Sequence, residues 1–204
     1  GSEMCIRDSL QADGNEPLSE DPEYREVHGT VFRQQRNSIK LSKENLLENI
    51  VTQNQELSED ACRDLVLASI AIKYTQSNSV GYALNGQMIG IGAGQQSRVD
   101  CTKLGGRKAE TWHLRSHPRV RSLPFRDEVG NVEKTNARIA FIEGEMTAPE
   151  RNSWLKLFKS DPGELSLEEK SEYILKMQEV CLSSDAFLPF RDNLDQASRR
   201  GVRY

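Results

Sequence analysis

Long apolar runs, paired cysteines and any strong excess of charge are all missing from this 204-residue chain. No apolar stretch approaches the roughly 18 residues that a membrane-spanning helix needs, and we find no export signal. The net charge of −4 gives no electrostatic footprint for nucleic acid. These absences favour a cytosolic globular protein that binds neither membranes nor nucleic acid.

Cysteine is scarce, and its spacing shows no pairs. One of the four cysteines falls within the first nine residues, and the other three are Cys62, Cys101 and Cys181. Such an odd set argues against a disulfide framework and favours reduced thiols. His113 and His117 stand four residues apart on a predicted helix, but no paired cysteine accompanies them. We therefore expect no zinc site.

Three regions of different composition follow one another along the chain. Residues 1–9, GSEMCIRDS, read as the in-frame translation of an adapter used in preparing sequencing libraries. Residues 10–21 are acidic and poor in apolar side chains, which is typical of a flexible segment. Residues 22–204 remain as the folded part, and they are numerous enough to bury a sizeable core.

A helix followed by a hairpin is the clearest structural prediction. Ser58 is placed to open a helix that runs from 60 to 73 and is apolar on nearly all sides. We expect such a helix to be covered on more than one side, as in a sheet flanked by helices. Residues 79–84 and 87–93 are predicted strands, joined by a two-residue Asn85-Gly86 turn.

Further helices are predicted downstream, which makes the fold class α/β with a mixed sheet. The predicted helices span 97–116, 132–142, 166–180 and 193–200. The first ends at His117-Pro118, and the third opens with a capping box formed by Ser166 and Glu169.

The stretch 73–102 is the candidate site because polar side chains and glycines alternate there without the pattern of a packed core. Two interpretations of its glycine-rich part, IGIGAG, stay open. Glycines can let the backbone approach a ligand beside the exposed amides of a helix start. They can equally form a buried strand under a closely packed helix.

Two other segments also carry alternative interpretations. The amide of Asn78 can both donate to a carbonyl and accept from an amine, or it can simply form a turn. In 187–193, two phenylalanines can sandwich a heterocycle while Asp192 and Asn193 bind its polar edge. Otherwise Phe187 and Phe190 fill the core and Asp192 caps the following helix.

Two separated motifs resemble one known family. KYTQSNSV with NGQMIGIGAGQQSR, and further on SSDAFLPFRDN, resemble the C-terminal half of the transformylase domain of the bifunctional AICAR transformylase/IMP cyclohydrolase family. The resemblance covers 22–204 and implies a piece truncated at both ends. It further implies a cytidine-deaminase-like sheet without the deaminase zinc site, and a homodimer with its sites at the subunit interface.

The activity implied by this resemblance is formyl transfer from 10-formyltetrahydrofolate to AICAR in purine (IMP) synthesis. Asn78 would orient the reacting groups and bind the developing oxyanion. The resemblance assigns substrate or folate contacts to Ser97, Arg98, Val99, Phe187, Pro189, Phe190, Asp192 and Asn193. It assigns a monovalent cation such as potassium to the oxygens of Thr75, Ser77, Ser79 and Asp185.

The catalytic lysine-histidine pair of the family does not occur in these residues, because no Lys-His dipeptide is present. The cyclohydrolase domain is not represented either. His28, His113 and His117 do not replace the missing pair. We expect the isolated piece to be inactive. A non-catalytic module for ligand binding or dimerisation is the alternative, and a remnant without an independent fold is a third.

Overall fold

The computed structural model describes residues 21–52 and 55–204, which divide into two compact units between residues 40 and 41. The interpretations of 1–9 and of nearly all of 10–21 fall outside the described residues. The first unit holds an antiparallel hairpin of β1 (Glu23–Val27) and β2 (Thr30–Gln34). His28 and Gly29 form its turn, with φ of 53° and 78°. This hairpin was not predicted from the sequence.

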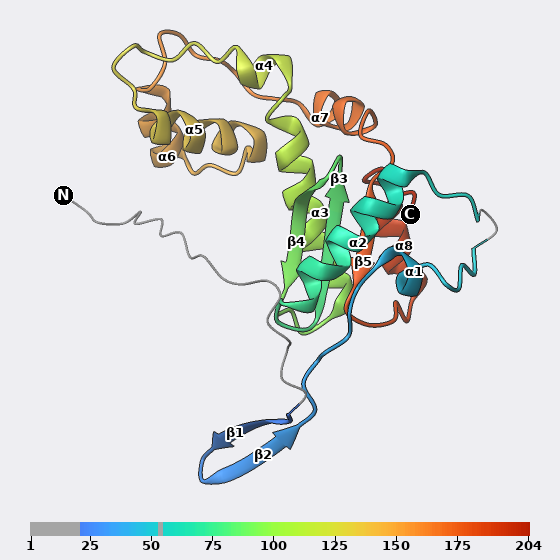
Figure 1. Ribbon diagram of the computed structural model, residues 1–204. Coiled ribbons are helices and arrows are strands. Elements are labelled where there is room, and N and C mark those ends of the chain that lie inside the picture. The colour runs from blue at the N-terminus through green and yellow to red at the C-terminus, as the bar shows by residue number, and fades with distance from the viewer. Residues whose placement is uncertain (1–20, 53–54) are drawn as a thin grey trace. The chain divides into compact units, whose positions relative to one another are not determined.

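The second unit is organised around a three-stranded antiparallel sheet in the order β4-β3-β5 (Figure 1). Strands β3 (Ser79–Leu84) and β4 (Gln87–Ala93) have the predicted bounds, and β5 (Cys181–Ser184) was not predicted. Asn85 and Gly86 form the hairpin turn with φ of 53° and 76°. The predicted mixed sheet is not found among the described residues, because all named strands pair antiparallel. An isolated parallel bridge joins Val180 and Val202 outside these strands.

Two helices cover opposite faces of this sheet. Helix α2 (Glu59–Lys73) lies against Gly81, where an added Cβ would stand 2.8 Å from Ile72. The next residue, Tyr82, is buried toward α3 (Arg98–Leu114), and its hydroxyl donates to the Thr102 carbonyl at 2.8 Å. Because successive strand residues face opposite sides, the helices must lie on opposite faces. The α/β class is therefore confirmed, and its deaminase-like topology stays a prediction.

The glycines of β4 permit unusually close packing against α3. A Cβ at Gly90 would stand 2.1 Å from the Gly105 carbonyl oxygen, and one at Gly92 would stand 2.0 Å from that of Cys101. Both distances are far below a normal carbon–oxygen contact, and the atoms in the way are backbone oxygens of α3, which cannot rotate aside as a side chain can. Of the two interpretations of IGIGAG, the buried strand under a closely packed helix is thus confirmed for the residues of β4.

The C-terminal helix also packs against α3. Helix α8 (Arg191–Ser198) begins two residues before its predicted start, and Phe190 is its N-cap. The expectation that Asp192 caps this helix is therefore wrong. Beyond the helix, Arg200 forms an ion pair of 2.9 Å with Glu110 of α3. Burial raises the pKa of Glu110, and Arg200 only partly opposes this effect. A four-residue helix, α1 (Lys43–Leu46), precedes α2.

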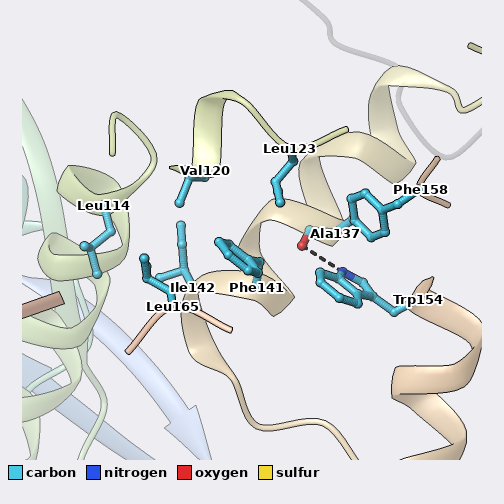
Figure 2. Packing of buried hydrophobic residues seen from close by; sticks show 9 residues of the cluster. All are labelled: Leu114, Val120, Leu123, Ala137, Phe141, Ile142, Trp154, Phe158 and Leu165. Carbon is cyan, nitrogen blue, oxygen red and sulfur yellow. Dashed lines mark hydrogen bonds between the residues drawn. The ribbon is translucent and has the colours of Figure 1, made fainter. Parts of the chain in front are cut away.

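Four helices between α3 and β5 build a second hydrophobic cluster (Figure 2). They are α4 (Pro118–Arg121), α5 (Asn131–Glu143), α6 (Ala148–Leu155) and α7 (Leu167–Ile174). The buried members of the cluster are Leu114, Val120, Leu123, Ala137, Phe141, Ile142, Trp154, Phe158 and Leu165. Helix α5 matches its prediction within one residue at each end, whereas α4 and α6 were not predicted.

Helix α7 is shorter than the predicted 166–180, although its Ser166/Glu169 capping box forms as expected. The helix ends at Ile174, and Met177 and Val180 are buried in the cluster that lies against the sheet. Glu179, with φ of 61°, turns the chain into β5. Burial of these two side chains thus overrides the helical pattern. Within the described ranges, no helix has both the length and the apolarity required to cross a bilayer.

Candidate functional site

Three segments that are distant in sequence meet at one end of the sheet. Ser79 of β3 pairs with Ala93 at the end of β4, and Val80 pairs with Ser184 at the end of β5. The residues just before β3 and just after β4 and β5 therefore lie together. These positions hold Asn78, Arg98 and Asp185, and we call them the corner cluster.

Arg98 is the hub of the corner cluster. Its Nη2 donates to Asn78 Oδ1 at 2.8 Å, and its Nη1 donates to Ser184 Oγ at 3.0 Å and to the Asp185 carboxylate. The side chain is only 11% exposed. Arg98 is also the first residue of α3, where unpaired backbone amides and the helix dipole add positive potential.

Asn78 connects the segment before β3 to the loop that precedes α3. Its Nδ2 donates to the carbonyls of Gln95 and Gln96 at 3.1 and 3.3 Å. Its own carbonyl accepts from the Cys101 thiol at 3.0 Å, and burial raises the pKa of that thiol. The amide is thus fixed from both sides, with Oδ1 polarised by the Arg98 guanidinium.

Asp185 is held as a carboxylate by its neighbours. Burial alone would raise its pKa, but hydrogen bonds from the Ser77 hydroxyl, the Ser79 N–H and Arg98 outweigh burial and lower the pKa. A carboxylate with a lowered pKa is a weak base. We infer that Asp185 positions Arg98 rather than removing a proton.

Replacing Asp185 with Asn should change how stability depends on pH. Because the folded-state pKa is lowered, the carboxylate contributes stability above its unfolded pKa of about 4, and this contribution is lost as the pH falls through the folded value. We expect Asp185→Asn to be less stable than the parent chain at pH 7, with the two curves converging below about pH 4. Urea unfolding from pH 7 to pH 2 measures this, and Glu168→Gln on the exposed face of α7 serves as the control. A constant gap between the curves would contradict the assignment.

The other residues predicted at this end have mainly structural contacts. Ser97 is the N-cap of α3, where its Oγ accepts from the Asp100 N–H at 3.2 Å. Val99 is half-buried. The Thr75 hydroxyl donates to the Ile72 carbonyl at 2.8 Å. The Ser79 hydroxyl is buried and has no hydrogen-bond partner among the described residues.

The two phenylalanines of the 187–193 segment are open to solvent. Phe187 is 80% exposed and Phe190 is 70% exposed, and Pro189 is exposed as well. The alternative in which the two rings fill the core is therefore wrong. Asn193 is buried, and its Oδ1 accepts from the Thr102 hydroxyl at 3.2 Å while its Nδ2 donates to Asp192 at 2.8 Å. This asparagine connects α8 to α3, while the aromatic faces stay free for contact.

Ser184 and Cys101 contact the corner cluster through Arg98 and Asn78, and neither residue was assigned to the site from the sequence. Ser184 directly precedes Asp185 in the second motif, so its position at the end of a strand could have indicated it. Cys101 lies one turn into α3, three residues after Arg98, and thus on the same helix face. From the sequence, Cys101 was expected to be a reduced thiol and not part of the site.

His113 and His117 lie toward the opposite end of α3 from the corner cluster, and His28 belongs to the other unit. His28 is in the hairpin turn of the first unit. His113 Nε2 contacts the Tyr173 carbonyl at 3.1 Å, and His117 Nδ1 accepts from the Arg119 N–H at 3.2 Å as the N-cap of α4. Across the described ranges, no group of three or more His, Cys, Asp or Glu residues could hold a metal ion.

Comparison with models of protein families assigns the chain to one family. Residues 7–108, half of the chain, match the model of the AICARFT/IMPCHase bienzyme. The chain belongs to the AICARFT/IMPCHase bienzyme family. The part of the chain that matches the family includes Asn78, Arg98 and Cys101. Asp185 and the segment 187–193 lie beyond the match.

A curated relative supports the assignment of this chain to the bienzyme family. The bifunctional purine biosynthesis protein PurH of Roseobacter denitrificans (strain ATCC 33942 / OCh 114) is 34% identical over 126 residues. This alignment covers 62% of the chain and 22% of the relative. The chain therefore spans about a fifth of the length of this bienzyme relative.

Proposed function

We propose that this chain is part of an AICAR transformylase domain, which transfers a formyl group from 10-formyltetrahydrofolate to AICAR in purine biosynthesis. The corner cluster is the observation that carries the proposal. It places an arginine, an asparagine and a helix start at one sheet end, within a chain of the bienzyme family. These groups suit a reaction in which negative charge develops on a carbonyl oxygen.

Each residue of the cluster has a role in this chemistry. The aromatic amine of AICAR is a weak nucleophile because its lone pair is delocalised toward the carboxamide. Catalysis therefore needs orientation and stabilisation of the oxyanion that forms when the amine attacks the formyl carbon. Asn78 supplies the orienting amide, Arg98 and Ser97 contact substrate with Val99 beside them, and Asp185 holds Arg98 in place.

The segment 187–193 supplies the proposed ring platform. The open faces of Phe187 and Phe190 suit stacking on the pterin or the nucleotide base, because apolar rings otherwise avoid water. The exposed Pro189 borders the two rings. Asp192 and Asn193 are proposed to bind the polar edge, although the Asn193 amide is already bonded to Thr102 and Asp192.

Proton removal must come from outside the corner cluster. Asp185 has a lowered pKa, and His113 and His117 bond to residues outside the corner cluster. We therefore propose that the isolated chain binds ligand without turnover. A non-catalytic ligand-binding or dimerisation module is the second candidate, and the same absence of a proton-transfer group favours it.

Of the residues proposed to bind a monovalent cation, some have an oxygen without a partner and others are already engaged. The buried Ser79 hydroxyl oxygen lacks a partner among the described residues and could accept a cation. Thr75 and Ser77 already donate elsewhere, and Arg98 neutralises Asp185. The potassium-like ion stays a proposal, and no step of the reaction depends on it. No zinc is proposed.

A homodimer is also proposed. Ile70 at 41% and Tyr74 at 76% exposure leave apolar surface open at the end of α2. A second copy of the complete domain would cover such surface.

Arg98→Gln tests the proposed function directly. We expect the 204-residue chain to bind AICAR, and this change to weaken binding by about 10- to 100-fold, because a charge-assisted contact is lost. Isothermal titration calorimetry measures the dissociation constant. Arg107→Gln, at an exposed side chain on the same helix, is the matched control. Equal affinity of Arg98→Gln and the parent chain would contradict the role of Arg98.

The same preparation separates the two candidate functions. The N-terminal half of the transformylase domain of the Roseobacter denitrificans relative is added as a separate polypeptide, and formyl transfer to AICAR is followed. Turnover only in the mixture supports the transformylase proposal. Binding without turnover in the mixture supports the non-catalytic module.

A further inference from the structure

A cavity at the opposite end of α3 from the corner cluster is lined by arginines. Arg115 follows the last residue of α3, Arg121 ends α4, and Arg138 lies in α5. Together with Thr135 these three side chains line a solvent-open cavity of about 510 Å³, in which Arg115, Arg121 and Thr135 are exposed and Arg138 is half-buried. We call it the arginine cavity. Guanidinium groups from the end of α3, from α4 and from α5 thus line the same cavity.

The guanidinium groups of this cavity lack acidic partners. Within 21–52 and 55–204, Arg115 and Arg121 form no side-chain hydrogen bond or ion pair, and Arg138 contacts only the Phe125 ring, at 5.2 Å. Neighbouring arginines are engaged, since Arg119 pairs with Glu169 and Arg126 donates to the Lys156 carbonyl. Unpaired like charges in one cavity repel each other, and a bound anion would relieve this repulsion.

The arginine cavity is remote from the corner cluster. Helix α3 has 17 residues, and a rise of about 1.5 Å per residue separates its ends by about 25 Å. Arg98 stands at one end and Arg115 just beyond the other. A single small ligand therefore does not bridge the two places.

We propose that the arginine cavity binds a small molecule through a phosphate group. A tetrahedral phosphate offers oxygens in several directions and accepts from guanidinium groups that converge from three helices. A planar carboxylate offers two oxygens and satisfies fewer of these donors. The volume also lies within the usual range for small-molecule sites. An extended nucleic acid is disfavoured because the chain as a whole carries a net charge of −4.

Titration calorimetry with inorganic pyrophosphate at constant ionic strength tests the proposal. We expect the 204-residue chain to bind one pyrophosphate at this cavity, and the double change Arg121→Gln with Arg138→Gln to weaken binding at least tenfold. Arg199→Gln, at an exposed arginine beyond α8, is the matched control and should retain the parent affinity. Circular dichroism checks that each variant is folded. If the double variant is not folded, Arg121→Glu alone, at an exposed position, should produce the same loss.

Three results would overturn the proposal. Loss of pyrophosphate binding in Arg98→Gln, with retention in the double variant, would place the anion at the corner cluster instead. Citrate binding as tightly as pyrophosphate would refute the phosphate class. Tighter binding of a single-stranded RNA oligonucleotide would replace a small ligand with nucleic acid.

Discussion

Trp154→Ala is expected to lower the free energy of unfolding by about 3–5 kcal/mol, the usual cost of removing a buried tryptophan. Trp154 is 6% exposed, stacks on Phe141 at 6.0 Å between ring centroids and contacts Phe158 at 4.5 Å. Its Nε1 donates to the Ala137 carbonyl at 3.0 Å (Figure 2). The change leaves a large cavity and removes this hydrogen bond. Urea unfolding followed by circular dichroism measures the loss.

Trp154→Phe separates the contribution of the Nε1 hydrogen bond from that of aromatic packing. It keeps an aromatic ring in the cluster and removes only the hydrogen bond and part of the volume. We expect a loss of about 1–2 kcal/mol, because one buried hydrogen bond contributes about 1 kcal/mol. A loss below about 1 kcal/mol for Trp154→Ala would mean that the helical cluster contributes little to stability.

Gly92→Ala is expected to cost about 3 kcal/mol and to abolish AICAR binding. Overpacking a core commonly costs about 1–3 kcal/mol, and the upper end applies because the added Cβ would stand 2.0 Å from the backbone oxygen of Cys101. Helix α3 and β4 must separate, which displaces Cys101 from Asn78 and Arg98 from Asp185. Unfolding experiments and AICAR titration measure the two effects.

Gly130→Ala is the matched control for this change. Gly130 has φ of −70°, and the nearest atom to an added Cβ is the flexible Glu133 carboxylate at 3.5 Å. Its position as a helix N-cap limits the expected loss to about 1 kcal/mol or less. If Gly92→Ala behaves like Gly130→Ala, close packing of β4 on α3 is not essential.

Local signals in the sequence predicted the centre of the fold well. The Asn85-Gly86 turn and the Ser58 cap depend on neighbouring residues alone, and both form as expected. Tertiary packing decided the rest. Burial of Met177 ended α7 early, and the four-residue β5 gains its strand conformation from pairing with β3. Helix α6 carries a Thr147/Glu150 capping box that could have been recognised.

The candidate site was predictable in part. Asn78, Arg98 and Asp185 were each assigned from motifs, and the structure brings all three together. Their mutual contacts depend on how β3, β4 and β5 are ordered, which periodicity does not specify. The arginine cavity was not predicted, because Arg115, Arg121 and Arg138 follow no motif and meet only through the packing of three helices.

The helical cluster and the sheet differ in how far along the chain their contacts reach. The cluster joins residues from Leu114 to Leu165, whereas the core against the sheet must bring Val80 to Val180. Closing the longer loop loses more chain entropy, and contacts between distant residues form more slowly. We therefore expect the helical cluster to assemble first during folding. The docking of β5, which completes the corner cluster, would then be a late event.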